Sequence, residues 1–258
     1  MSVLKLDKVS IAFGGLKALS DISLTVEKGQ IVGIIGPNGA GKTTLFNLLT
    51  GMYVPTSGEI LFKKNDSIKL NGLKPYKITS YGIARTFQNI RLFGDMTVLD
   101  NVKMGFHSRT KCGFFSSVIR LPSYYDEERK VNEEAIEMLK ILNLESKKDE
   151  LAKSLPYGEQ RRLEIARALA SKPSVLLLDE PAAGMNPNET KELTNFIAWI
   201  REKFDLTIIL IEHDIKLVMG ICNKVYVLNY GNLIAGGTPE EVQKNPQVIE
   251  AYIGSEGA

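Results

Sequence analysis

The residues with the clearest chemical meaning form a glycine-rich run that ends in one lysine and two threonines. The run fits the pattern G-x-x-x-x-G-K-[ST], in which backbone N–H groups turn inward around phosphate oxygens at the start of a helix. Lys42 would supply a charge for the β- and γ-phosphates, and the Thr43 hydroxyl would bind Mg²⁺. An apolar run, Ile31–Ile35, precedes the motif and a helix-compatible stretch, Lys42–Leu49, follows it, which disfavours a chance glycine turn beside a surface lysine. The expected phosphate-binding residues are Gly36, Pro37, Asn38, Gly39, Ala40, Gly41, Lys42, Thr43 and Thr44.

Two adjacent carboxylates follow a second apolar run at residues 175–178. Ligands of open α/β sheets bind at the carboxyl ends of the strands, which is where Asp179 and Glu180 would lie. Asp179 would hold Mg²⁺, directly or through water, and Glu180 would accept a proton from, or orient, the water that attacks the γ-phosphate. By itself this pattern also fits a strand that ends in solvated acids. Together with the phosphate-binding motif, it predicts a nucleoside triphosphatase.

The elements that would position these residues alternate between strand and helix. Alternating apolar residues predict strands near the N-terminus, and apolar runs at 31–35, 175–178 and 207–211 predict buried strands. The composition between residues 90 and 158 is mostly that of helices, and Thr97 with Asp100 predicts a helix start there. We therefore expect one domain over 1–258, with an α/β core at 1–89 and 159–258 and a helical insert at 90–158. Residues 111–125 are expected to form a loop or a short helix.

Composition excludes several classes of protein. The chain has 258 residues, enough for a substantial core, and its 32 Lys and Arg residues nearly balance 30 Asp and Glu residues. The resulting net charge of +2 gives no electrostatic reason to expect nucleic acid as a partner. Cys112 and Cys222 are too few for a disulfide scaffold and fit a reducing compartment. No apolar stretch approaches the ~20 residues of a spanning helix, and Lys5, Asp7 and Lys8 interrupt any signal-peptide core, so we expect a cytoplasmic chain.

On these motifs, the sequence resembles the ATP-binding subunits of ABC transporters over nearly its whole length. Gln88, in the run Arg-Thr-Phe-Gln, stands where that family has a glutamine that ligates Mg²⁺ and water and senses the membrane domain. His213, in the run Ile-Glu-His-Asp, resembles the switch histidine of the family, which contacts the γ-phosphate. Phe13 is placed like the aromatic residue that stacks on adenine.

This resemblance implies ATP and Mg²⁺ as ligands. It also implies a P-loop NTPase core of the RecA-like type with a mostly parallel sheet, an N-terminal antiparallel β subdomain and a helical insert. The catalytic residues it implies are Lys42, Gln88, Glu180 and His213, and the metal ligands are Thr43, Gln88 and Asp179.

The signature of the family, usually Leu-Ser-Gly-Gly-Gln, corresponds to residues 155–159 and differs at two positions. Pro156 replaces the serine whose hydroxyl reaches the γ-phosphate on the opposing subunit, which removes a charge-assisted hydrogen bond worth ~1.5–3 kcal/mol. Tyr157 replaces a glycine. Asn186 likewise stands where the family commonly has an aspartate. Of the signature positions, the resemblance implies as remaining contacts to the opposing nucleotide the residues Leu155, Gly158 and Glu159.

Three further runs resemble one ATPase subunit of branched-chain amino acid importers, namely 84–101, 157–167 and 250–254. That resemblance implies a second ATPase subunit, either a different chain or a second copy of this one. It also implies two membrane-spanning permease subunits and, indirectly, an extracytoplasmic solute-binding protein, with no nucleic acid. The chain would then lie peripherally at the cytoplasmic face of the inner or plasma membrane, held there by its partner subunits.

Other classes remain as alternatives. An ATPase of the lipopolysaccharide-export type shares the run at residues 161–167 and a similar tail. A soluble ABC-type ATPase acting on DNA would need long heptad arms, and one acting on ribosomes would carry two phosphate loops in one chain. A metabolic P-loop kinase would have neither the signature nor the switch histidine.

Overall fold

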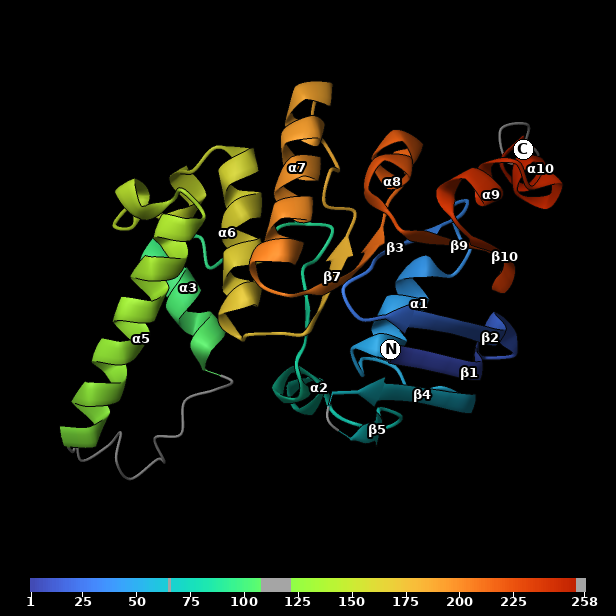
Figure 1. The fold of residues 1–258 in the computed structure, drawn as a ribbon. Helices are drawn as coiled ribbons and strands as arrows, with labels where there is room; N and C mark the ends of the chain where they lie inside the picture. Colours follow the sequence, from blue (N-terminus) through green and yellow to red (C-terminus); the bar gives the residue numbers. More distant parts are fainter. Residues whose placement is uncertain (65, 108–121, 254–258) are drawn as a thin grey trace. The chain divides into compact units, whose positions relative to one another are not determined.

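The strands that carry the continuous apolar runs lie side by side in a six-stranded sheet (Figure 1). The order is β10 (Asn232–Gly237), β9 (Lys224–Asn229), β3 (Ile31–Ile35), β8 (Thr207–Ile211), β7 (Val175–Asp179) and β6 (Ile83–Arg85). β10 pairs with β9 antiparallel, and every other neighbour is parallel. β3, β7 and β8 are buried at every residue, as expected for apolar strands that are covered on both faces of the sheet. The carboxyl ends of the parallel strands therefore share one edge, where β3, β7 and β8 lead into the predicted site residues.

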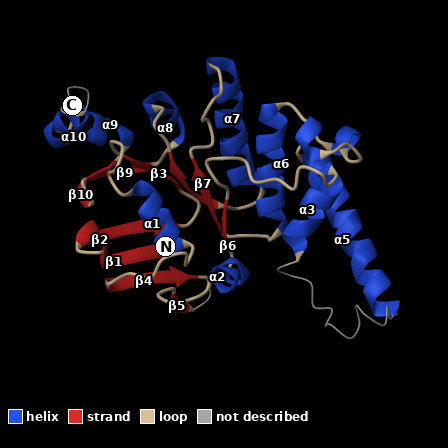
Figure 2. Ribbon diagram, turned by 180° about the vertical axis from the view of Figure 1, so that it is seen from behind, coloured by secondary structure: helices blue, strands red, loops and turns tan. Residues whose placement is uncertain are grey.

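A second, antiparallel sheet is formed mainly by the N-terminal residues. Its order is β2 (Leu16–Glu27), β1 (Ser2–Phe13), β4 (Ser57–Lys63) and β5 (Ser67–Lys69). Helix α1 (Lys42–Leu49) lies between the two sheets in both ribbon views (Figures 1 and 2). Leu45 and Phe46 of this helix belong to one buried apolar cluster with Leu6 of β1 and Val32 of β3. This packing fixes the helix that follows the phosphate-binding motif.

The structure, a computed structural model, describes residues 1–64, 66–107 and 122–253, which fall into two units. Both sheets belong to the first unit, Met1–Gln88 with Ser174–Ala258. Its remaining helices are α2 (Pro75–Tyr81), α7 (Pro187–Lys203), α8 (Ile215–Ile221), α9 (Pro239–Gln243) and α10 (Pro246–Ile253). Thr238 and Glu241 form a capping box at the start of α9.

The second unit, Asn89–Pro173, is helical. It contains α3 (Val98–Phe106), α5 (Pro122–Ile141), α6 (Tyr157–Ala170) and two short 3₁₀ turns, Glu145–Lys147 and Ala152–Ser154. The unit extends to Pro173, whereas the sequence predicted an insert that ends at residue 158. The reason is that α6 packs against α3 at Gly105, where any Cβ would overlap the Arg167 carbonyl.

The fold class predicted from the sequence, an α/β core with an antiparallel N-terminal sheet and a helical insert, is confirmed. The bounds of β3, α1 and β8 are those predicted, whereas α2, β6 and β10 were not predicted. The segment expected as a loop or short helix at 111–125 lies largely outside the described residues, and 122–125 open helix α5. Among the described residues, no helix combines the length and apolarity that crossing a membrane requires.

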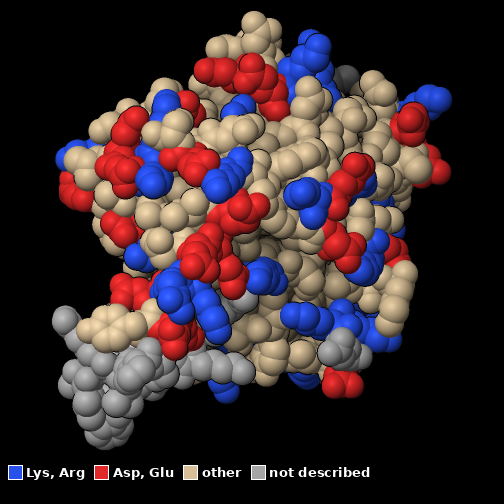
Figure 3. Space-filling view, turned by 60° about the vertical axis from the view of Figure 1, so that its left-hand side comes forward, with Lys and Arg blue, Asp and Glu red and all other residues tan. Residues whose placement is uncertain are grey.

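Acidic and basic side chains are interspersed on the face shown in Figure 3. Within the second unit, such charges form ion pairs at the surface, for example Lys172 with Glu134 at 2.9 Å.

Candidate phosphate-binding and hydrolytic site

The phosphate-binding motif forms a tight loop between β3 and α1. Its three glycines all have positive φ, at 149° for Gly36, 77° for Gly39 and 104° for Gly41. A Cβ on Gly36 would overlap the Leu228 carbonyl, and one on Gly41 would lie 2.6 Å from a methyl carbon of Leu19. Only glycine fits these positions without strain. The loop leads directly into α1, whose N-terminus has no side-chain cap. The first N–H groups of a helix that starts in this way can bind an anion.

Lys42 lies folded over this loop. Its Nζ donates to the carbonyl oxygens of Gly36 at 2.7 Å and Pro37 at 2.9 Å, and the residue is buried. Burial lowers the pKa of the Lys42 ammonium, and the charges of Glu180 and Asp179 act in the opposite direction. The ammonium is thus placed at the centre of the loop, close to both carboxylates.

A cavity of about 390 Å³ opens over the loop. Besides the loop it is bordered by Glu180, by His213 and by the turn between β9 and β10. Its lining residues are Leu16, Lys17, Ala18, Asn38, Gly39, Ala40, Gly41, Lys42, Thr43, Thr44, Glu180, His213, Tyr230 and Gly231. The sequence did not single out Tyr230, an exposed aromatic side chain held in a turn with φ of 44°.

Phe13, the predicted adenine contact, lies outside the lining of this cavity. Phe13 is 45% exposed, and its ring meets the ring of Tyr53 edge to face, with 5.0 Å between the ring centroids. The described contacts of Phe13 are therefore those of a small aromatic pair, and its stacking role stays a prediction.

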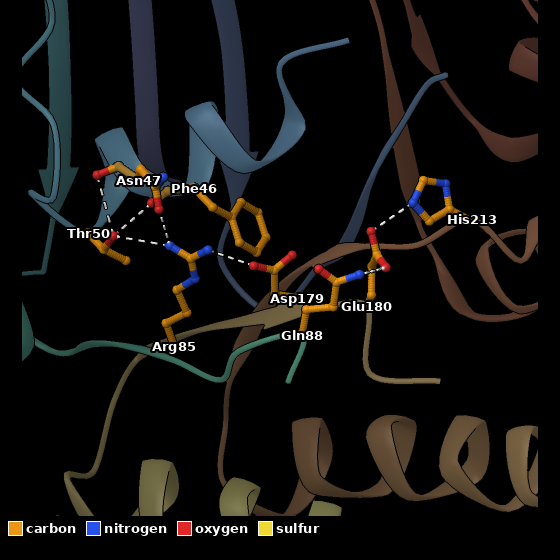
Figure 4. Close-up of polar contacts among 8 residues, drawn as sticks. All are labelled: Phe46, Asn47, Thr50, Arg85, Gln88, Asp179, Glu180 and His213. Carbon is orange, nitrogen blue, oxygen red and sulfur yellow. Dashed lines mark hydrogen bonds and ion pairs between the residues drawn. The ribbon is translucent and has the colours of Figure 1, made fainter. Parts of the chain in front are cut away.

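Glu180 receives hydrogen bonds from two of the predicted site residues (Figure 4). Gln88 Nε2 donates to Glu180 Oε2 at 2.6 Å, and His213 Nε2 lies 2.7 Å from Glu180 Oε1. If the carboxylate is ionised it can only accept, and the histidine then donates from Nε2. Glu180 itself has a φ of 45°, the left-handed region that a residue with a side chain rarely adopts. The structure thus brings Gln88, Glu180 and His213 together at the edge of the sheet.

Arg85 is a site residue that sequence reasoning missed. Its Nη2 donates to Asp179 Oδ2 at 2.6 Å, and both side chains are only 7% exposed. The other end nitrogen, Nη1, donates to Asn47 Oδ1 of α1 at 2.7 Å (Figure 4). The available signal was an arginine in an apolar stretch three residues before Gln88, but the three-residue strand β6 is too short to be predicted from periodicity.

Glu212 is a second buried acid that the sequence analysis did not use. Its Oε1 accepts from the Ala182 N–H at 2.8 Å and its Oε2 from the His213 N–H at 3.1 Å. Desolvation by burial raises the pKa of the Glu212 carboxyl, a shift that these backbone hydrogen bonds oppose. Glu212 therefore links Ala182, in the loop that follows Glu180, to His213, whose side chain contacts Glu180.

The signature-like residues lie in the second unit, where they begin helix α6. Pro156 is the N-cap residue and offers no side-chain hydrogen bond, since it has replaced the serine of the usual signature. Leu155 is buried, and a Cβ at Gly158 would meet nothing within 4 Å. Glu159 accepts two hydrogen bonds from Lys147 Nζ, at 2.6 and 2.8 Å. The helix start is thus held by local contacts within the unit.

Asn186 has a local reason for its identity. Its side chain accepts from the N–H groups of Asn188 and Glu189 and forms a capping box with Glu189 at the start of α7. Asparagine is among the best N-cap residues, so the helix start is satisfied without the charge of an aspartate.

Comparison with known proteins gives matches over nearly the whole chain. The family model described as "ABC transporter" matches residues 19–183, and that described as "Branched-chain amino acid ATP-binding cassette transporter" matches residues 232–258. The high-affinity branched-chain amino acid transport ATP-binding protein LivG of Salmonella typhimurium is 46% identical over 98% of both chains. The corresponding protein BraF of Pseudomonas aeruginosa is 45% identical, also over 98% of both.

Solved structures show the same likeness. A nucleotide-free ATP-binding cassette from an ABC transporter is 33% identical with a TM-score of 0.83, and covers 98% of this chain and 99% of its own. The ADP conformation of an ATP-binding cassette is 34% identical with a TM-score of 0.84 and the same coverage.

Proposed function

Since the chain belongs to the ABC transporter family of ATP-binding subunits, whose ATP hydrolysis drives transport, we propose that it serves an importer of branched-chain amino acids. The observation that carries the proposal is the match along 98% of both chains to relatives named for this transport, at 45–46% identity. The match of residues 232–258 to a branched-chain amino acid family model supports it independently. These likenesses favour import over the lipopolysaccharide-export type.

The phosphate loop and its lysine account for nucleotide binding. The glycine backbone, the free N-terminus of α1 and Lys42 would hold the β- and γ-phosphates of ATP. Thr43 and Asp179 suit Mg²⁺, since hydroxyl and carboxylate oxygens are its preferred ligands, and Gln88 would contribute its amide oxygen. Asp179 fits this role because Arg85 uses only its Oδ2, while no described hydrogen bond or ion pair involves its Oδ1. The bound cation would neutralise charge on the phosphates.

Hydrolysis would then follow from the placement of Glu180. The carboxylate takes a proton from water as the water oxygen forms a bond to the γ-phosphorus, and the bond to the bridging oxygen breaks to release ADP. Gln88 and His213, hydrogen-bonded to the two oxygens of Glu180, would hold it in orientation. Glu180 lines the cavity over the loop and has a φ of 45°, a strained backbone conformation of the kind found at functional sites.

The partners follow from the family. We propose a head-to-tail pair of ATPase subunits, in which each ATP lies between one phosphate loop and the partner's residues equivalent to Leu155, Gly158 and Glu159. Two permease subunits would hold the pair at the cytoplasmic face of the membrane, with a solute-binding protein on the opposite side.

The proposal is tested by purification from detergent-solubilised membranes and reconstitution of the recovered complex in lipid. We expect two membrane-spanning subunits to co-purify, and ATP hydrolysis to rise when a binding protein loaded with leucine, isoleucine or valine is added. A binding protein loaded with a sugar serves as the control. Recovery of no membrane subunit would count against a transporter, and stimulation by other solutes alone would count against this substrate class.

A further inference from the structure

We propose that Arg85 is a positioning residue for Asp179: it holds one carboxylate oxygen so that the other faces the divalent cation of the bound nucleotide. The inference rests on the proposed function, in which Asp179 is a ligand of that cation. Arg85 does not line the cavity over the loop, so in this proposal it acts only through the side chain that it orients.

The two ends of the guanidinium have different partners. Nη2 donates to Asp179 Oδ2 at 2.6 Å, and Nη1 donates to Asn47 Oδ1 at 2.7 Å and reaches Thr50 Oγ1 at 3.5 Å. Asn47 belongs to α1, the helix that begins with Lys42 and Thr43. Arg85 therefore fixes the carboxylate at the end of β7 relative to the helix that carries the phosphate-binding residues (Figure 4).

Two aromatic rings also contact the guanidinium of Arg85. The ring centroids of Phe46 and Phe87 lie 5.4 and 5.2 Å from Arg85 Cζ, within the range of cation–π contacts. Such contacts and the fork of two end nitrogens restrict the side chain to one orientation. A lysine could supply the charge, but its single ammonium cannot donate along both directions with the same fixed geometry.

One nitrogen of the guanidinium has no partner in this arrangement. Arg85 Nε is buried and has no hydrogen-bond partner among the described residues, and a buried unpaired donor is unfavourable. Arginine and carboxylate groups frequently form a bidentate pair, in which two parallel N–H groups donate to both carboxylate oxygens. Here the contact with Asp179 uses Oδ2 alone and leaves Oδ1 available.

The same short segment also reaches the neighbouring carboxylate. Gln88, three residues after Arg85, donates to Glu180, and the intervening Thr86 N–H donates to the Leu177 carbonyl of β7 at 2.9 Å. Residues 85–88 thus contact the proposed metal ligand and the proposed base, which are adjacent in sequence. Arg85 positions Asp179, and Gln88 contacts Glu180.

The test measures how much Mg²⁺ strengthens ATP binding, with a fluorescent ATP analogue titrated in excess EDTA and in Mg²⁺. We expect Arg85→Gln to leave the affinity in EDTA within about twofold and to reduce the Mg²⁺ enhancement by about tenfold or more, the usual effect of removing a group that orients a metal ligand. Arg85→Lys should retain part of the enhancement. Arg129→Gln, which removes an arginine from an exposed ion pair with Asp126, should change nothing.

Thermal unfolding of each variant without ligand shows separately whether the substitution has changed the stability of the fold. If Arg85→Gln does not fold, Asn47→Ala removes the other anchor of the guanidinium and should lower the same enhancement to a smaller extent. Equal losses in EDTA and in Mg²⁺, or a stronger enhancement, would overturn the proposal. Asp179→Asn tests the metal role of Asp179 separately from the positioning role of Arg85. If this variant keeps the Mg²⁺ enhancement, the proposed metal role of Asp179 fails. If Asp179→Asn lowers the enhancement and the Arg85 variants do not, the role of Arg85 alone fails.

Discussion

Gln88 and Glu180, 92 residues apart in sequence, share a hydrogen bond of 2.6 Å between Nε2 and Oε2. The bond joins the segment after β6 to the carboxylate after β7. It restrains one oxygen of Glu180, while His213 restrains the other. In the proposed mechanism Glu180 is the general base, which must hold its orientation to accept a proton along one direction. Loss of this bond should therefore act on the chemical step.

We therefore expect Gln88→Ala to lower kcat for ATP hydrolysis by about tenfold to a hundredfold, since a misplaced catalytic group costs on the order of a hundredfold. Steady-state ATPase assays of the reconstituted complex would measure this. Gln243→Ala is a matched control, because Gln243 is an exposed residue of α9 and does not line the cavity over the loop. A rate for Gln88→Ala equal to that of the native complex would show that the bond to Glu180 is dispensable.

Replacement of Glu180 by glutamine keeps the side-chain shape but removes the basic oxygen. We expect ATP to bind with nearly unchanged affinity and hydrolysis to fall by about 10²–10⁴-fold, the range for general-base catalysis. Equilibrium nucleotide binding and single-turnover hydrolysis measure the two effects separately. Glu202→Gln, at a 72% exposed carboxylate paired with Arg201, is the control. Normal turnover by Glu180→Gln would remove Glu180 from the proposed role.

The raised pKa of Glu212 predicts a pH dependence of stability. A carboxyl whose pKa is higher in the folded than in the unfolded state binds its proton more tightly when folded. Its contribution to the free energy of unfolding is therefore fully present below the unfolded pKa, and declines as the pH rises from there through the folded pKa.

Glu212→Gln should remove this decline. The variant also loses one acceptor, because the glutamine amide cannot accept from the N–H groups of Ala182 and His213 together, a constant loss of about 1 kcal/mol. We expect the urea midpoint of the variant to move toward or past that of the native protein as the pH rises from 4.5 to 8. A constant difference between the two proteins across that range would contradict the assigned shift.

The parts of the fold that could be predicted are those with local signals. The bounds of β3 and β8 follow from uninterrupted apolar runs, and the start of α9 follows from Thr238 and Glu241. Arg85 could not be found in this way, since its role comes from partners 38 and 94 residues away and its strand has only three residues. The resemblance of motifs singled out Gln88 and His213 as site residues, but their shared contact with Glu180 depends on the tertiary structure.

The same substitution, glycine to alanine, should have opposite effects on stability at two positions in the second unit. In α3, a Cβ on Gly105 would overlap the Arg167 carbonyl and lie 2.7 Å from the Ala170 Cβ. Gly105→Ala should therefore force α3 and α6 apart and lower the free energy of unfolding by about 1–3 kcal/mol, the usual cost of overpacking.

Gly158→Ala is the matched substitution in α6. A Cβ there would meet nothing within 4 Å, and alanine has the higher helix propensity, so we expect stability to rise by up to about 1 kcal/mol. Urea unfolding followed by circular dichroism measures both variants, and an unchanged slope with denaturant shows that only stability has changed. If Gly105→Ala proved as stable as Gly158→Ala, the close approach of α3 and α6 would not limit the size of residue 105.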